Sequence, residues 1–459
     1  MPTLCRFACL AASLFSVAAA AQAADTINLS ADLRPGQLAQ VKFQMEVGGQ
    51  LKMVRDGKVS QTPMKVDGKS AYRERLLAAA DGSRVSRSVR KYDSAAGTLT
   101  IERRKLTPEL SSPHRLIVAS VGKDAQTLFC PTGLLTRDEL DLIDVPCSTL
   151  LINRLLPGKT VKLGDTWRHQ PEDLALLLGL DAVSQADVES VVSQLKDGEA
   201  EMALAGTVAG AVGGVATDIE LKAKYRFNQV AGRIDWLAML IKENRSVGHA
   251  APGVDVVAKL QVQIDPLAKA EDLSEAALAG VPLEPAPELT RLAYVSPSGE
   301  LSMAVNRGWQ VVNEDGQIAV LRLVERGDLL AQCNATRLPP LASGNKLSLA
   351  DFQTEVRKAL GDNFRQFAEA AELTSGADYH VLRVVAQGSV SDLPIEWRYY
   401  HITDRSGRRA SLAFTISQQF TERFGENDQE LALGLRLMEP TVGAPTTAAK
   451  PSPLKLKAK

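Results

Sequence analysis

Residues 379–418 read YHVLRVVAQGSVSDLPIEWRYYHITDRSGRRASLAFTISQ, and this stretch decides the fold of the second half of the chain. Polar and apolar residues alternate in three runs, and SDLP and RSGRR separate the runs. Alternation is typical of a strand with one buried face, and short polar breaks are typical of hairpin turns. The stretch therefore predicts a three-stranded antiparallel meander.

The chain as a whole has the composition of a globular protein. It has 459 residues, of which 45% are hydrophobic and 23% are charged, and its formal net charge at pH 7 is -1. Domains usually contain about 100–200 residues, so the length predicts two or three, and we favour two. The composition excludes a collagen-like, coiled-coil or disordered class for most of the chain. The small net charge gives no whole-molecule argument for a nucleic-acid partner or an anionic membrane.

The first 23 residues have the pattern of a secretory signal peptide. Arg6 precedes an uncharged run from Phe7 to Ala21, and Ala21-Gln22-Ala23 fits a small-x-small cleavage site. An uncleaved anchor is the alternative, but the run is shorter than the ~20 residues that span a bilayer. No later window is long and apolar enough for a transmembrane helix. We expect a mature chain from Ala24 that is exported to the periplasm or the extracellular space, without a transmembrane segment.

Proline and glycine divide the remaining chain into two expected domains. A mainly antiparallel β domain with a few helices is predicted over 24–266, because alternating runs are separated by turn residues. A Pro-rich linker follows over 267–290, and its VPLEPAPE segment favours an extended spacer. The second domain covers 291–438, and the tail 439–459 should be disordered. The predicted fold class is therefore α+β.

Several elements of the first domain can be predicted from the pattern. Four successive strands are expected at 199–208, 215–227, 233–243 and 254–264. A hairpin is expected over 84–106, with its turn at 94–97. Helices are expected over 172–180 and over 185–195, the second because Val188, Val191, Val192 and Leu195 recur at helical spacing.

The second domain contains two expected helices. Ser348 and Asp351 form an N-terminal capping pair, so a helix is expected from Ser348 through Phe367, with a break at Gly361 as an alternative. A last helix is expected over 427–438, where leucines recur. The order of the elements is then strands, long helix, meander and terminal helix.

Three features of this half resemble the PsbP-like α/β/α sandwich, a small fold found in the extrinsic photosystem protein PsbP and in periplasmic DcrB-type proteins. They are Gly308-Trp309 before the first main strand, the helix from Ser348, and IEWRYYHITDRSGRRASLAFTI over 395–416. The resemblance covers 291–438 and implies an accessory, assembly or binding role and not an enzymatic one. The first domain, with Leu156-Pro157, Gly164-Asp165 and Trp167 among its features, resembles secreted bacterial domains of unknown function.

Three cysteines remain after removal of the signal peptide, namely Cys130, Cys147 and Cys333. An odd number allows at most one disulfide bond within the chain. Cys130 and Cys147 flank a short helix that Thr136 and Glu139 would cap, and a bond between them would add about 3 kcal/mol of stability. Two buried free thiols are the alternative. Cys333 lies in a predicted strand and is expected to be a small core residue.

His380 and His401 form the one histidine pair that can act together as a ligand-binding site. A turn near Ser391 would place them close to opposite each other on neighbouring strands, within reach of one metal ion or one anion. A metal would need a third ligand, for which only Glu396 and Asp404 are near. We therefore predict no metal site and no cofactor, and the alternative for the pair is two strand-face histidines.

No catalytic residues are predicted. The sequence has no GxSxG motif, and the carboxylates of DELDLID over 138–144 fit the acidic first turn of a helix. We expect an exported cell-envelope protein that acts by binding or assembly, with a protein or envelope component as partner and no nucleic acid. One alternative is an enzyme without a recognisable motif. Another is a carrier of a lipid or other apolar ligand in the first domain, with a cavity lined by Met202, Leu204, Trp236, Leu240 and Ile241.

Overall fold

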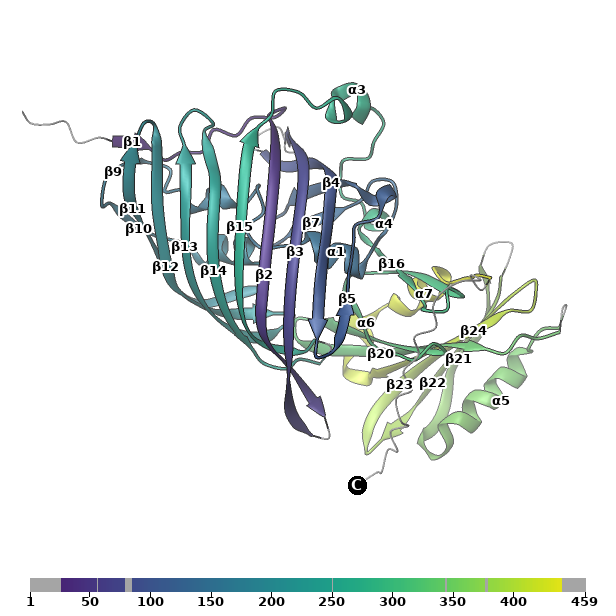
Figure 1. Ribbon diagram of the computed structural model, residues 1–459. Coiled ribbons are helices and arrows are strands. Elements are labelled where there is room, and N and C mark those ends of the chain that lie inside the picture. The colour runs from purple at the N-terminus through teal and green to yellow at the C-terminus, as the bar shows by residue number, and fades with distance from the viewer. Residues whose placement is uncertain are drawn as a thin grey trace, which may run out of the picture.

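The computed structural model describes residues 26–439, except 56, 79–84, 250, 343–344 and 376–378. The predicted signal peptide and, from residue 440 onward, the predicted tail lie outside the described residues. The described residues form four β-sheets and a few short helices (Figure 1). One pair of strands is parallel, and the other paired strands are antiparallel. The predicted class, α+β and mainly antiparallel, is confirmed.

The first half of the chain builds a 12-stranded sheet. Its strands are β2 (Leu38–Arg55), β3 (Lys58–Ala78), β4 (Val85–Ile101), β5 (Arg104–Leu106), β6 (Leu116–Val121), β7 (Gln126–Phe129), β10 (Thr166–Arg168), β11 (Ala182–Lys196), β12 (Glu199–Val212), β13 (Val215–Asn228), β14 (Arg233–Arg245) and β15 (Gly253–Pro266). Their order is β10-β11-β12-β13-β14-β15-β2-β3-β4-β6-β7, with β5 beside β4. The early strand β2 therefore lies next to β15, the last strand of this half (Figure 1). The four strands expected between 199 and 264 are confirmed as β12 to β15.

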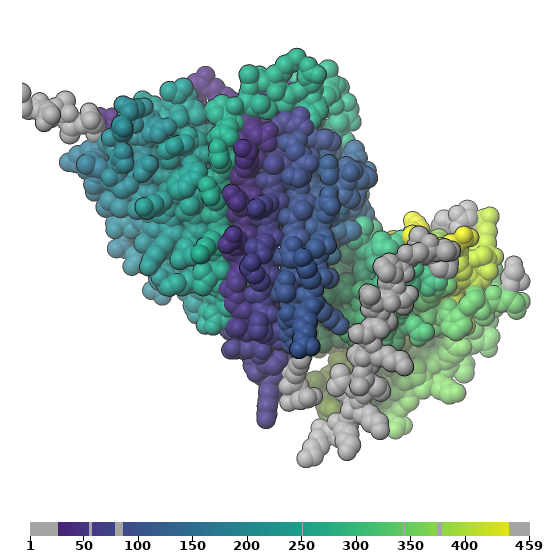
Figure 2. All heavy atoms as spheres, viewed as in Figure 1, coloured from purple at the N-terminus to yellow at the C-terminus, as the bar shows by residue number. Residues whose placement is uncertain are grey.

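The large sheet has one buried face and one exposed face. In β13, for example, Leu221, Ala223, Tyr225 and Phe227 are buried, and the residues that alternate with them are exposed or half-buried. The buried face packs against the chain that connects β7 to β11, where the Tyr225 hydroxyl donates to the Leu155 carbonyl at 3.3 Å. In the views of Figures 1 and 2 no helix lies in front of the other face, across β12 to β3.

The connecting chain contains short elements that complete the core of this half. They are β8 (Leu135–Thr136), α1 (Arg137–Ile143), η2 (Ile152–Leu155), β9 (Thr160–Lys162) and α2 (Pro171–Leu178). Strand β9 pairs with β1 (Thr26–Asn28) in a small two-stranded sheet. Leucine and isoleucine side chains of α1, η2 and α2 belong to the same continuous hydrophobic core as the buried face of the large sheet. The interior of this half is therefore filled by packed side chains.

Two predictions for the first half are wrong. Residues 185–195 belong to strand β11 and not to a helix, because Val188, Ser190 and Val192 alternate into the core and β11 pairs along β12. Valine favours strands, so its helical spacing here was misleading. The turn expected at 94–97 is instead part of the continuous strand β4, because the 21-residue strand β3 supplies partners beyond Ala95. The helix expected over 172–180 is confirmed as α2.

A four-stranded sheet joins the two halves of the chain. It consists of β8, β16 (Leu292–Val295), β17 (Leu301–Val305) and β25 (Arg436–Leu437), and β8 pairs in parallel with β16. Arg137 Nη2 donates to the Arg307 carbonyl at 2.6 Å, and one hydrophobic core extends through both halves. The last expected helix is shorter than predicted, since α7 (Asn427–Leu433) ends before Gly434 and the chain then enters β25.

The second half contains a seven-stranded sheet between helices. Its strands are β18 (Trp309–Glu314), β19 (Ile318–Glu325), β20 (Asp328–Leu338), β21 (Phe364–Ser375), β22 (Tyr379–Val390), β23 (Leu393–Asp404) and β24 (Arg409–Ser417). Their order is β18-β19-β20-β24-β23-β22-β21, so the predicted meander is confirmed as β22 to β24. On one face α5 (Leu349–Leu360) packs Phe352 against Leu382 and Trp397. On the other face lie α7 and α6 (Thr421–Phe424), where Phe424 contacts Phe414.

The helix expected to reach Phe367 ends at Leu360. Gly361 has a φ of +52°, and strand β21 begins at Phe364, so the alternative break at Gly361 is the observed one. The remaining helical segments are η1 (Ser112–His114), η3 (Glu271–Leu273), α3 (Glu275–Leu278), α4 (Pro287–Thr290), η4 (Gly361–Asn363) and η5 (Gln418–Phe420).

Candidate functional site

The predicted ligand-binding histidines lie on the α5 side of the seven-stranded sheet. His401 pairs with Leu382, two residues from His380, so the two rings are diagonal neighbours and not directly opposite. His401 is 1% exposed and packs against Phe352, with 5.7 Å between the ring centroids. Burial, and secondarily the nearby Arg409 and His380, lower the pKa of His401 to about 4. Its ring is therefore neutral at pH 7.

The structure does not bring the named third ligands to this pair. Glu396 and Asp404 are five and three residues from His401 on β23, and an odd spacing places side chains on opposite faces of a strand. Glu396 instead accepts a hydrogen bond from Arg398 Nε at 2.9 Å on the other face. Among the described residues, no group of three or more His, Cys, Asp or Glu side chains could hold a metal ion.

The three cysteines are free thiols buried in the core. Cys147 Sγ lies 3.8 Å from Met239 Sδ, and Cys130 Sγ lies 3.3 Å from Thr132 Oγ1. The two thiols thus have different neighbours, as in the alternative without a disulfide bond. Burial raises the pKa of Cys147 to about 12, so this thiol is not a thiolate nucleophile at neutral pH. Cys333 is a fully buried strand residue, as expected.

The acidic run over 138–144 covers helix α1, with Asp138 and Glu139 in its first turn and Asp144 at its C-cap. Thr136 Oγ1 accepts from Glu139 N at 3.2 Å, and Glu139 Oε2 accepts from Thr136 N at 2.9 Å, which is the expected capping box. Glu139 also contacts His114 Nδ1 at 2.8 Å and accepts from Ser111 N at 3.1 Å. The Glu139 carboxylate is therefore engaged in holding the helix.

A buried charged cluster on the other face of the seven-stranded sheet was not predicted from the sequence. Asp428 on α7 is fully buried. It accepts hydrogen bonds from Tyr400 Oη at 2.5 Å, from Arg398 Nη1 at 2.7 Å and from Arg383 Nη2 at 3.3 Å. Alternation places the three donors on one face of the meander, but their acceptor lies on a distant helix. The cluster holds α7 against the sheet, and its charged and polar groups are hydrogen-bonded to one another.

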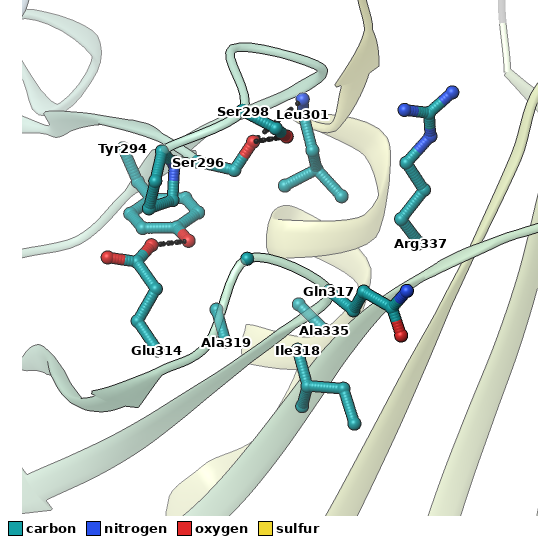
Figure 3. Close-up of a pocket in the computed structure, with 12 residues that line it drawn as sticks. Tyr294, Ser296, Ser298, Leu301, Glu314, Gln317, Ile318, Ala319, Ala335 and Arg337 are labelled. Atoms are coloured by element: carbon teal, nitrogen blue, oxygen red, sulfur yellow. Dashed lines mark hydrogen bonds between the residues drawn. The ribbon is translucent and has the colours of Figure 1, made fainter. Parts of the chain in front are cut away.

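A small cavity lies between the four-stranded sheet and the edge of the seven-stranded sheet (Figure 3). The Tyr294 hydroxyl donates to Glu314 at one side, and Leu301 and Arg337 also line the cavity. Its volume is about 20 Å³. A space of this size holds about one water molecule, so it is too small for an organic ligand.

The candidate functional site is a hollow on the exposed face of the 12-stranded sheet, with a volume of about 660 Å³. It extends across β12, β13, β14, β15 and β2, within the uncovered face that Figure 2 turns toward the reader. Two rows of side chains cross these strands in register. The first row is Ala205, Lys222, Leu240, Lys259 and Glu46, and the second is Ala203, Lys224, Ala238, Gln261 and Gln44.

Short apolar side chains form the floor of this hollow. Ala203, Ala205 and Ala238 stand among long side chains, so the space above them is open. Leu240 and Trp236 are half-buried and add apolar surface on β14. The volume lies within the range of about 300–1,000 Å³ that is usual for small-molecule sites.

Lysines form the rim of the hollow. Lys222, Lys224 and Lys259 are exposed, and Glu46 is the acidic residue of the lining, so three positive charges face one negative charge. Lys222 lies 3.5 Å from a glutamate, but within the described residues neither Lys224 nor Lys259 makes an ion pair. An apolar floor with unpaired cations at its edge suits an anion that carries a hydrocarbon part.

The five residues predicted to line a cavity for an apolar ligand divide between the two faces of the sheet. Met202, Leu204 and Ile241 are buried in the core, whereas Trp236 and Leu240 lie at the hollow on the exposed face. The alternation of side chains along a strand is the reason, because Ile241 directly follows Leu240 on β14. The structure therefore does not bring the five side chains together.

Comparison with known proteins finds solved structures that are similar to parts of the chain. No protein-family model matches the sequence, and no curated protein matches it. The structure is similar to cyanobacterial PsbP from Synechocystis sp. over 32% of this chain and 92% of that chain, at 15% identity and a TM-score of 0.26. It is also similar to lipovitellin over 52% of this chain and 26% of that chain, at 9% identity and a TM-score of 0.28. Within the described residues no helix has the length and apolarity to cross a membrane.

Proposed function

We propose that this chain is an exported cell-envelope protein that acts by binding, and that the lysine-rimmed hollow holds an anionic lipid of the envelope. The observation that carries the proposal is that Lys224 and Lys259, which make no ion pair within the described part of the chain, lie beside an apolar floor on an uncovered sheet face. The lipid phosphate would lie against these ammonium groups, and a hydrocarbon chain would lie over Ala238 and Leu240. The export follows from the N-terminal sequence pattern, and the compartment is the periplasm or the extracellular space.

Charge and apolar contact act together at such a surface. A lysine near an anionic lipid surface contributes about 1 kcal/mol, and this contribution is weakened by salt. Covering apolar surface contributes about 25 cal/mol per Å². Trp236 is suited to the boundary between the two environments, because indole combines an apolar ring with one polar N–H group.

We further propose that residues 291–438 form a PsbP-like sandwich of the DcrB type, and that residues 24–266 form a domain like those of secreted bacterial proteins. The support is the layering of the second half, where α5 and the pair α6 and α7 lie on opposite faces of the seven-stranded sheet. An accessory or assembly role for this half is compatible with lipid binding by the other half.

Replacing Lys224 and Lys259 together by glutamine should weaken binding to phosphatidylglycerol vesicles roughly 30-fold, as expected for two lysines at about 1 kcal/mol each. The measurement is co-sedimentation with vesicles at low ionic strength, repeated with pure phosphatidylcholine vesicles. Wild-type protein should prefer the anionic vesicles, and the preference should decrease as salt is added.

The matched control is the double variant Lys159→Gln and Lys162→Gln, which removes two exposed lysines outside the hollow. We expect its affinity to remain close to that of the wild-type protein. An equal loss in both double variants would indicate a general charge effect and not a site. Absence of wild-type binding to anionic vesicles would contradict the proposed function itself.

A further inference from the structure

A second hollow, of about 520 Å³, lies at one end of the 12-stranded sheet. It lies beside the place where β14 and β15 separate, because their pairing begins at Trp236 and Gln263 and does not include Arg233. The start of β2 and the turn between β13 and β14 complete its walls. Apolar side chains line much of it, including Leu38 and Ile264.

Arg233 is a buried cation in this lining. Its side chain is charged at neutral pH and the residue is 6% exposed. Its Nε and Nη2 atoms are buried and have no hydrogen-bond partner among the residues that the structure describes. Buried donors are nearly always paired in proteins, and a buried unpaired charge is costly. Arg233 also lines the hollow, and an acceptor there would contact Nε and Nη2 once the side chain turns toward it, because both atoms are buried as the side chain stands.

The neighbouring carboxylates do not supply that acceptor. Glu74 Oε1 accepts from Arg90 Nε at 3.0 Å, and Glu74 Oε2 is buried without a hydrogen-bond partner among the described residues. Glu74 therefore acts on Arg233 as a nearby charge and not through a hydrogen bond. Asp235 is held by Arg226, through Nε at 2.9 Å and Nη2 at 3.1 Å. The buried group of Arg90, Arg233 and Glu74 thus has two positive charges and one negative charge. One further anion would balance it.

We propose that this hollow binds an apolar monocarboxylate, whose carboxylate is held by Nε and Nη2 of Arg233. These two nitrogens form a planar fork that matches the two oxygens of a carboxylate. Arg226 uses the same two nitrogens to hold Asp235 only a few residues away. The apolar walls at Leu38 and Ile264 suit the hydrocarbon part of the ligand. This site is separate from the lysine-rimmed hollow and does not rest on the function proposed for it.

Titration calorimetry with decanoate, below its micelle concentration and in chloride-free buffer, tests the site. We expect wild-type protein to bind decanoate, and Arg233→Met to bind it at least tenfold more weakly because the fork is lost. Arg233→Lys should fall between them, since it keeps the charge without the fork. Acetate and inorganic phosphate should bind wild-type protein more weakly than decanoate. The variant Lys224→Gln with Lys259→Gln should bind decanoate as wild-type protein does.

Thermal unfolding separates this role from a purely structural one. If Arg233 only balances Glu74, then Arg233→Met should unfold at a lower temperature than wild-type protein without any ligand. The proposal expects instead that ligand-free Arg233→Met is at least as stable as wild-type protein, because an unpaired buried charge has been replaced by an apolar side chain. Decanoate should raise the unfolding temperature of the wild-type protein only. No binding by wild-type protein, or equal decanoate affinity in wild type and Arg233→Met, would overturn the proposal.

Discussion

Replacing Asp428 by alanine is expected to lower the free energy of unfolding of the second half by about 3–5 kcal/mol. Asp428 is fully buried and accepts hydrogen bonds from Arg383, Arg398 and Tyr400. Without the Asp428 carboxylate, the buried guanidinium groups of Arg383 and Arg398 lose a compensating negative charge. Charges in the protein interior are poorly solvated, so this loss destabilises the folded state. Urea unfolding, followed by the fluorescence of Trp309 and Trp397, which are both buried in this half, measures the change.

The control for this prediction lies two residues away on the same helix. Glu430 has a side chain that is 55% exposed, and it forms an ion pair with Arg291 at 3.5 Å. Glu430→Ala should therefore change the stability by less than about 1 kcal/mol. Similar losses in Asp428→Ala and Glu430→Ala would show that the buried cluster does not hold α7 to the sheet.

Acidification from pH 7 to below pH 4 is expected to remove up to about 3 kcal/mol of stability through His401 alone. Burial lowers the pKa of His401 from 6.5 to about 4 in the folded protein. As the pH falls below 6.5, the unfolded chain binds the proton first, so protonation favours unfolding. The contribution is complete above pH 6.5 and is lost between pH 6.5 and pH 4. Burial also lowers the pKa of His169 to about 4, which adds a loss in the same range.

The variant His401→Phe isolates the contribution of this ring. Phenylalanine keeps a planar ring against Phe352 and cannot be protonated. Urea unfolding at pH 7 and at pH 4 should give a smaller acid-induced loss in this variant, by about 3 kcal/mol, than in the wild-type protein. The exposed His249 provides the control, since His249→Gln should leave the loss unchanged. An unchanged loss in His401→Phe would contradict a neutral, buried ring.

Local sequence patterns predicted the fold well where neighbouring residues in the chain also pair in space. The meander over 379–418 is an example, because each strand pairs with the next through a short turn. Prediction failed where the pairing along the partner strand, and not the local pattern, decided the structure. Residues 94–97 look like a turn, but the length of β3 keeps them in a strand. Residues 185–195 match a helical spacing, but pairing with β12 makes them a strand.

The candidate sites depend even more on long-range pairing. The hollow unites segments near residues 45, 204, 223, 238 and 260, and only the register of five strands places their alanines and lysines together. Neither the burial of Arg233 nor its unpaired nitrogens leave a signal in the sequence. The spacing alone could have excluded Glu396 and Asp404 as third ligands, because both are an odd number of residues from His401 on the same strand and so lie on its opposite face.

Photocrosslinking from the floor of the hollow most directly tests whether this face binds anionic lipid. A photoreactive phenylalanine analogue would replace Ala238, at the centre of the hollow, or Ala71 on strand β3, outside it. After irradiation with phosphatidylglycerol vesicles, mass spectrometry should find lipid attached to the protein labelled at 238, with much less attached at 71. Equal attachment at the two positions, or none at 238, would contradict binding of the lipid in the hollow.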